Sequence, residues 1–357
     1  MNSWERFRAF ARRERIDRPL RYAQFTPDLA ERLAQRIGTG DFEAYFEMDL
    51  PVYVWPAEPN GFVRPDFTGY FSDVKPGEID WIDDIGVGRR RGSLYHFTER
   101  VSPLRNAESL ADLEEFPVVD YEGWDGSRMA AEVDAVHRRG RIAGGNVGHI
   151  YEYSWQVRGY EEFLSDMLVR PEWCDVLLDK FMRRAMNLTR ACARAGVDSL
   201  HCGDDVANQR TLMFRVELWR RFMKPRWAQV WAAARAIKPD IQILYHSDGN
   251  VEMIINELRE IGMTILNPLQ PECMDLDRLA GRYRGRLLFD GSIGTQTVFP
   301  FGTPDGIRRC VAERMRQFGQ DIRLAPTHVL EPEVPMENIF AFFAAVDAMR
   351  LRRDWSA

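Results

Sequence analysis

From about residue 127 onward, short apolar segments alternate with longer amphipathic ones, and this rhythm constrains the fold more than any other feature. The apolar segments have the length of strands, and the amphipathic segments have helical periodicity. Such alternation is typical of a parallel sheet whose right-handed crossovers place helices on the outside. The predicted strands are Arg141–Asn146, Asp198–Cys202, Ile241–Tyr245, Thr264–Asn267, Arg286–Phe289 and Ile322–Ala325.

The fold class that best fits this pattern is α/β, a (β/α)₈ TIM barrel with an irregular N-terminal extension. The length of 357 residues suits one such barrel. We expect a single domain over 1–357, irregular over 1–120 and built of regular β/α units over 121–357. An open doubly wound sheet is the alternative, but the glycine-rich stretch Gly144–Gly148 lacks the spacing of a dinucleotide-binding loop.

The first 120 residues are broken repeatedly by proline and glycine, which interrupt regular structure. Within them Phe42–Val54 and Tyr95–Val101 are strand-like in composition. The basic run Arg89–Arg91 is expected to be a solvated or anion-facing loop. The remaining barrel strands are expected in this part of the chain.

Composition narrows the functional class. The formal net charge of -6 gives no overall positive field, so nucleic-acid binding is not expected. Five scattered cysteines without a Cys-x-x-Cys pair favour reduced thiols in the cytoplasm over a secreted disulfide framework. The charged N-terminus has no signal-peptide character, and no apolar stretch reaches membrane-spanning length. We therefore expect a soluble cytoplasmic protein with no membrane partner.

Polar side chains collect where the predicted strands end. In a barrel the C-terminal ends of all strands face one pocket, so these side chains should converge. For any single aspartate, helix capping or turn formation is a simpler role. Histidines at two separate strand ends need a different explanation, because capping does not require them. The residues concerned are His201, Asp204, Asp205, His246, Asp248, Gln270 and His328, with Tyr151 and Glu152 after the first strand.

Two chemistries fit these residues. His246, Asp248 and His328 form an acceptable three-ligand metal set that leaves a position open for substrate. Alternatively, His328 acts as an acid or base whose pKa is set by Asp248 or Asp205. Glu152 is a further candidate for proton transfer. Substrate contacts are expected from Tyr151, Asp204, His201 and Gln270.

The stretch from about Arg141 to Met349 resembles the uroporphyrinogen decarboxylase superfamily, which includes corrinoid-linked methyltransferases. The resemblance implies a (β/α)₈ barrel with its pocket at the strand C-termini. It is carried by Gly203-Asp204-Asp205, Trp219–Pro225, His246-Ser247-Asp248-Gly249-Asn250, Gly291, Gly302-Thr303-Pro304, and His328 with Pro335–Ile339.

The superfamily has two branches with different chemistry. The decarboxylases use a histidine resembling His328 in position, together with arginines of an Arg-Gln-Ala-Gly-Arg segment, and this chain has Arg21-Tyr22-Ala23-Gln24-Phe25 instead. The thiol methyltransferases hold zinc by a His-x-Cys pair and a later cysteine. At what resemble those positions this chain has His246-x-Asp248 and His328. Replacing both thiolates hardens the site, so it need not hold zinc or activate a thiol.

The resulting prediction is a methyltransferase-like enzyme acting on a small methylated or methoxylated substrate, with a corrinoid on a separate partner protein. A divalent metal, zinc among the candidates, would be held by His246, Asp248 and His328, while Asp205 or Glu152 positions substrate or shuttles a proton. One alternative is a metal-free decarboxylase or lyase in which His328 is the acid and Arg89–Arg91 or Arg158 holds a carboxylate. Another is a non-catalytic binding barrel. The oligomeric state is open, with a homodimer as one arrangement.

Overall fold

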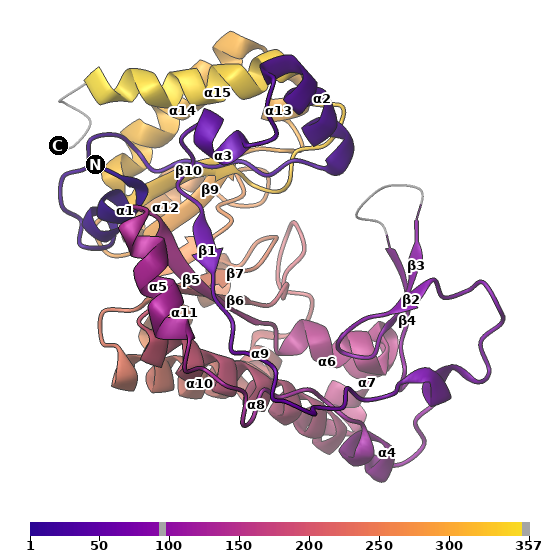
Figure 1. The fold of residues 1–357 in the computed structure, drawn as a ribbon. Coiled ribbons are helices and arrows are strands. Elements are labelled where there is room, and N and C mark those ends of the chain that lie inside the picture. Colours follow the sequence, from indigo (N-terminus) through magenta and orange to yellow (C-terminus); the bar gives the residue numbers. More distant parts are fainter. Residues whose placement is uncertain (93–97, 352–357) are drawn as a thin grey trace.

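The centre of the molecule is a curled sheet of seven parallel strands (Figure 1). The structure is a computed structural model that describes residues 1–92 and 98–351. Each of the six predicted strands overlaps an observed one, and a seventh comes from the N-terminal part. In spatial order the strands are β1 (Pro51–Tyr53), β5 (Ile142–Gly148), β6 (Ser199–Gly203), β7 (Gln242–His246), β8 (Ile265–Asn267), β9 (Leu288–Ile293) and β10 (Ile322–Pro326).

One extended segment around Arg21 contacts the chain beside both edges of this sheet. Arg21 forms an isolated parallel bridge with Leu324 of β10. On its other side, the Asp49 N–H donates to the Arg21 carbonyl oxygen at 2.7 Å, just before β1 begins. These are contacts of single residues and not a strand ladder, so the observed architecture is a curled seven-stranded sheet.

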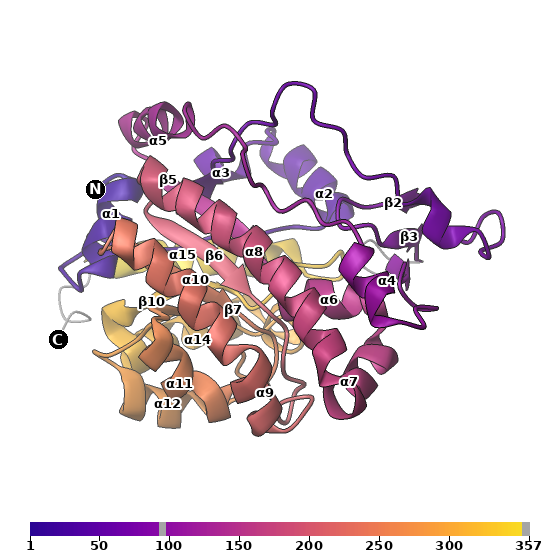
Figure 2. The same ribbon diagram turned by 90° about the horizontal axis from the view of Figure 1, so that it is seen from below.

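Helices cover the outer face of the sheet (Figure 2). The longest, α8 (Pro171–Ala195), packs against β5 and α10, and it begins at a proline and ends before Gly196, the residues that favour helix starts and stops. The helical stretch from Val216 to Ile237 is interrupted at Met223, two residues before Pro225. None of the helices in the described ranges is both long and apolar enough to cross a membrane. The others are α1 (Ser3–Ala11), α2 (Pro27–Ile37), α3 (Phe42–Tyr45), α4 (Leu110–Glu115), α5 (Met129–Arg138), α6 (Tyr151–Arg158), α7 (Tyr160–Val169), α9 (Val216–Phe222), α10 (Lys224–Ile237), α11 (Ile255–Ile261), α12 (Leu276–Tyr283), α13 (Val298–Phe301), α14 (Pro304–Phe318) and α15 (Met336–Ala348).

The inner face of the curled sheet is apolar at one end and polar at the other. At the N-terminal ends of the strands, Phe7 and Phe10 of α1 pack in one buried cluster with Leu244, Ile265 and Leu288. Side chains two positions further along a strand point to the same face. The inner face therefore changes from hydrocarbon to polar side chains towards the C-terminal ends, where the pocket was predicted.

The N-terminal part differs from its prediction in two places. Arg89–Arg91 was expected as a loop but belongs to strand β3 (Gly88–Arg91), because it pairs antiparallel with β4 (Thr98–Val101) and β2 (Trp81–Ile82) in a small separate sheet. Within Phe42–Val54, predicted as strand-like, the first residues form helix α3, and only the three residues of β1 pair with β5. The prediction of a strand over Tyr95–Val101 holds from Thr98, since 93–97 lie outside the described residues.

Candidate active site

Polar side chains from neighbouring strands line a cavity of about 60 Å³ inside the curl of the sheet. Strand alternation places two of them there: Asn267 and Asp290 are each two residues beyond an apolar residue of the inner face. Within the lining, Arg323 forms an ion pair with the fully buried Asp290. The polar lining consists of Tyr22, Gln24, Tyr53, Ser199, His201, Asn267, Asp290 and Arg323.

His201 belongs to this inner face, whereas its neighbour Cys202 faces outward. The His201 Nδ1 atom lies 2.8 Å from the Tyr53 hydroxyl, and the His201 and His246 rings are 6.1 Å apart. Cys202 accepts a hydrogen bond from the Trp231 indole in the outer layer. Burial, followed by the nearby His246 charge, lowers the pKa of His201 to about 3, so this imidazole is neutral at physiological pH.

Asp205, His246 and Asp248 come together where β6 and β7 end. One ligand atom from each lies within 4.8 Å of the others. The approach depends on Gly203, because a Cβ there would lie 2.1 Å from the His246 carbonyl oxygen. Asp205 accepts the Asp248 N–H at 2.7 Å, which fixes the two loops together. Burial raises the pKa of Asp205, although the His246 charge opposes that shift.

The orientation of His246 is fixed by Asn267 at the end of β8. The His246 Nδ1–H donates to the Asn267 side-chain oxygen at 2.6 Å. In the neutral imidazole the other ring nitrogen, Nε2, carries its lone pair towards Asp205, whose Oδ1 is 3.6 Å away. Asp248 contributes a buried oxygen, Oδ1, that has no hydrogen-bond partner among the residues that the structure describes. The carboxylate oxygens and the imidazole nitrogen of this group therefore direct electron pairs towards one another, and a cation between them would stabilise the arrangement.

A second group, His149, Glu152 and Asp204, lies beside the first. Asp204 is fully buried, and both of its oxygens are engaged by N–H groups of the protein. One accepts the backbone N–H of Ile150 and of Glu152 at the start of α6, and the other accepts the Trp227 indole N–H at 2.8 Å. Burial raises the pKa of Asp204 to about 7. Asp204 thus joins three elements and is not placed as a cation ligand.

His149 and Glu152 form an ion pair with 2.6 Å between Nδ1 and Oε2. Burial opposes charge on His149, but the Glu152 carboxylate outweighs it and raises the pKa of His149 to about 9. Burial likewise opposes charge on Glu152, and His149 overcomes it and lowers the pKa of that carboxyl. The same Glu152 oxygen accepts the Asp205 N–H at 3.2 Å, so the ion pair adjoins the first group.

The other predicted site residues have different surroundings. Tyr151 is buried in the core with its ring against Phe163 and Phe214. Gln270 accepts the Gly249 N–H at 2.6 Å and holds the loop that carries Asp248. His328 is exposed on the segment after β10 and belongs to neither group. Its catalytic and metal-binding roles therefore stay predictions.

Sequence reasoning passed over Asn267 and Tyr53. Asn267 ends a predicted strand, and an amide at a strand end beside a histidine-bearing strand is a signal that could have identified it. Tyr53 lies in the irregular N-terminal part, where only three residues pair with β5, too few for alternation to reveal its direction.

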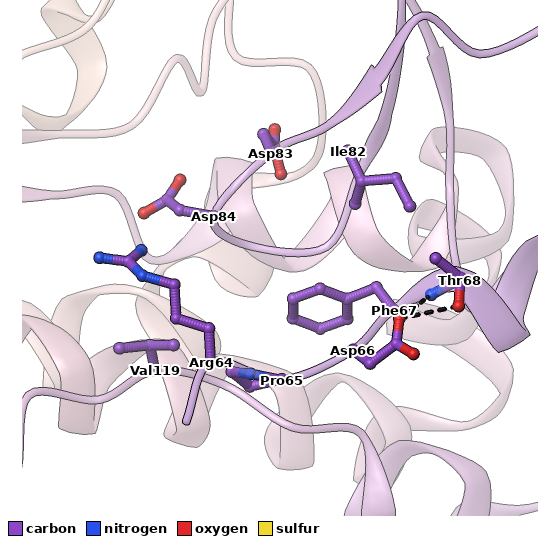
Figure 3. Close-up of a pocket in the computed structure, with 9 residues that line it drawn as sticks. All are labelled: Arg64, Pro65, Asp66, Phe67, Thr68, Ile82, Asp83, Asp84 and Val119. Atoms are coloured by element: carbon purple, nitrogen blue, oxygen red, sulfur yellow. Dashed lines mark hydrogen bonds between the residues drawn. The ribbon is translucent and has the colours of Figure 1, made fainter. Parts of the chain in front are cut away.

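A separate cavity of about 350 Å³ lies in the N-terminal part (Figure 3). The Phe67 ring and the Arg64 side chain line it on one side and the turn Ile82–Asp84 on the other. None of the predicted site residues lines it. We therefore place the candidate active site at the strand ends.

Comparisons with known proteins agree with the predicted superfamily. Residues 150–349 match the family model described as uroporphyrinogen decarboxylase (URO-D). Among curated proteins, no sequence matches significantly. A solved methyltransferase from Methanosarcina mazei superposes with a TM-score of 0.67 at 17% identity, covering 98% of this chain and 99% of that one. A solved α-amylase from Lactobacillus plantarum reaches only a TM-score of 0.36 at 12% identity, over 88% of this chain and 71% of that one, which is too low to indicate a shared fold or function.

Proposed function

Because the chain belongs to the uroporphyrinogen decarboxylase family, we propose that it is a methyltransferase-like enzyme acting on a small methylated or methoxylated substrate. The methyl acceptor would be a corrinoid carried by a partner protein. The fold would be a closed single-domain barrel, in which the segment around Arg21 takes the eighth strand position. The observation that carries the proposal is the group Asp205, His246 and Asp248 at the C-terminal edge of the sheet.

The residues of this group fit a divalent metal. They supply one imidazole nitrogen and carboxylate oxygens, a donor set that suits zinc and harder divalent cations. The unpartnered Asp248 Oδ1 and the short distance from His246 Nε2 to Asp205 Oδ1 are both accounted for by a cation. Asp205 takes the place that sequence reasoning gave to His328. The absence of a cysteine from the group separates the proposed site from one that activates a thiol.

Methyl transfer places a specific demand on this site. The methyl group leaves without its bonding electrons, and the electron pair stays on the oxygen or other atom that carried it. A bound divalent metal would stabilise that charge as a Lewis acid. Asp205, His246 and Asp248 would hold that metal, and a proton would reach the leaving atom through Glu152 from His149, whose raised pKa keeps it protonated.

The test is the zinc content of purified protein after incubation with zinc and removal of the excess, measured by elemental analysis. We expect about one zinc per chain in the wild type and its loss in His246→Ala. His137→Ala is the matched control, because His137 also lies against an aspartate, Asp198 at 2.9 Å, but at the opposite end of the sheet. Equal zinc in all three proteins would overturn the assignment.

Activity measurements separate this proposal from its alternatives. Methyl transfer should be lost with the metal and in His246→Ala. Activity that survives chelation and disappears in His328→Ala would instead support a metal-free decarboxylase or lyase. Binding of a small molecule with no turnover of methylated or carboxylated compounds would support a non-catalytic barrel.

A further inference from the structure

Hydrogen bonds join the small sheet β2–β3–β4 and the segment after it to α6, the helix that carries Glu152 (Figure 1). The Arg89 guanidinium donates to the Gln156 side-chain oxygen at 2.7 Å. Just after β4, the Leu104 N–H donates to the Val157 carbonyl oxygen at 2.9 Å, and Arg158 donates to the Leu104 carbonyl oxygen at 2.6 Å. Helix α6 starts at the C-terminal end of β5, so these contacts fix the hairpin formed by β3 and β4 relative to the candidate site.

The pairing register determines which arginines face α6. Arg89 lies opposite Arg100, Arg90 opposite Glu99, and Arg91 opposite Thr98. Residues directly opposite in an antiparallel pair share a face, and the face alternates along each strand. Arg89, Arg91 and Arg100 are therefore on one face, and the contact of Arg89 with Gln156 identifies it as the side towards α6.

In the described part of the chain, the guanidinium groups of two of these three arginines form no ion pair, although the Arg91 backbone N–H donates to the Asp80 carboxylate at 2.8 Å. Arg89 is neutralised by Asp83 at 2.6 Å. In the residues that the structure describes, neither Arg91 nor Arg100 forms an ion pair, and the five residues at 93–97 contain no acid in the sequence. On the opposite face, Arg90 has its own partner in Glu99 at 3.4 Å. Arg89 and Arg100 lie directly opposite each other, and Asp83 offsets the repulsion between their charges.

Arg100 lies above the part of α6 that leads to the candidate site. Its guanidinium carbon is 5.4 Å from the centre of the Trp155 ring. Trp155 is three residues after Glu152 and so lies on the same side of the helix. Burial and the Arg89 charge lower the pKa of Arg100, while the Glu152 carboxylate acts in the opposite direction. Glu152 in turn contacts Asp205, so Trp155 and Glu152 connect Arg100 to the proposed metal group.

We propose that Arg91 and Arg100 bind a carboxylate of the substrate, so that the methylated compound is an anion held at one end by the hairpin. The inference rests on the proposed function and adds the chemical class of its substrate. Guanidinium groups bind carboxylates through paired charge-assisted hydrogen bonds, and the Trp155 ring offers a flat apolar surface for the body of the molecule.

The test compares 4-methoxybenzoate with its neutral amide, 4-methoxybenzamide, by calorimetric titration of the full chain at low salt. We expect the wild type to bind the carboxylate roughly fivefold tighter than the amide, a difference typical of an accessible charge pair. Arg100→Gln and Arg91→Gln should each reduce that preference towards unity. Arg90→Gln is the matched control, because it removes the same charge from the opposite face and should keep the preference.

Equal affinity for the two probes in the wild type, no measurable binding of 4-methoxybenzoate, or an equal effect of all three substitutions would overturn the inference. Circular dichroism of each variant shows whether the fold is kept, and Arg100→Lys, which keeps the charge, should retain part of the preference. The titration needs neither metal nor corrinoid. If the protein prefers the carboxylate but binds no zinc, the carboxylate subsite is supported and the metal-assisted methyl transfer is contradicted. If it binds zinc but shows no preference for the carboxylate, the metal site is supported and the subsite is contradicted.

Discussion

The His246 Nδ1 atom lies 2.6 Å from the Asn267 side-chain oxygen, and this contact decides which nitrogen of the histidine faces Asp205 and Asp248. The amide oxygen only accepts, so it favours the tautomer with the proton on Nδ1, and Nε2 of the neutral ring is then available as a ligand. Such outer partners orient metal ligands, and their removal commonly weakens metal binding ten- to a hundredfold, as a general order of magnitude.

Asn267→Ala should therefore lower zinc affinity by roughly tenfold or more without abolishing it. The measurement is a competition titration against a chelator of known affinity. Asn250→Ala serves as the comparison, because Asn250 follows β7, the strand that ends at His246, but its side-chain oxygen accepts the Glu252 N–H. An Asn267→Ala protein that binds zinc as tightly as the wild type would show that Asn267 does not orient the ligand.

Removing Asp204 should destabilise the fold more than it alters metal binding. Asp204→Ala leaves the N–H groups of Ile150, Glu152 and Trp227 buried without an acceptor. Each lost partner costs about 1–3 kcal/mol, so we expect the free energy of unfolding to fall by about 3 kcal/mol or more. Chemical denaturation measures this free energy of unfolding. Asp134→Ala, at an exposed position, is the control and should change it by no more than about 0.5 kcal/mol. A loss no larger than in that control would contradict the structural role of Asp204.

How much of this could be predicted from the sequence depends on how local each signal is. The strands carrying His201 and His246 were found because an apolar run bounded by turn residues is a local pattern. The sequence alone does not decide which of His201 and Cys202 faces inward, because a one-residue change of register exchanges them between faces. The contact of Arg21 with Leu324 involves one residue on each side and leaves no periodic trace.

The candidate site was predicted in part for the same reason. His246 and Asp248 were placed together because they are two residues apart at one strand end. Their proximity to Asp205 depends on how the loops after β6 and β7 turn. That path is set by long-range contacts such as the close approach of Gly203 to His246, which spacing along the chain does not encode.

The His149–Glu152 ion pair should make stability depend on pH in the alkaline range. The pKa of His149 is raised from 6.5 to about 9, so its contribution is complete below 6.5 and is lost as the pH rises through about 9. Unfolding of chelator-treated protein should show this decline in stability between pH 6.5 and 9. In Glu152→Gln the decline should flatten, because the partner charge is gone. Parallel pH profiles of the free energy of unfolding in the wild type and in Glu152→Gln would contradict this contribution of the ion pair.

Asp49 should be among the residues whose loss damages the fold most. It is fully buried, and each of its oxygens lies 2.6 Å from a buried arginine, Arg6 on one side and Arg18 on the other. Asp49→Ala leaves the buried Arg18 guanidinium without a carboxylate and Arg6 with only the partly exposed Asp17, and breaking a buried pair in this way costs about 3–5 kcal/mol. Because Arg6 belongs to α1, which fills the N-terminal end of the curled sheet, the loss should also loosen that helix.

Asp17→Ala provides the comparison, since Asp17 also bonds to Arg6, at 2.7 Å, but its side chain is 38% exposed and Arg6 keeps Asp49. Its cost should be about 1 kcal/mol, as for other solvent-accessible ion pairs. Hydrogen exchange of the α1 amides, measured together with denaturation, should show faster opening in Asp49→Ala than in Asp17→Ala. Similar losses in both variants would mean that the burial of Asp49 does not determine how firmly the N-terminal helix is held.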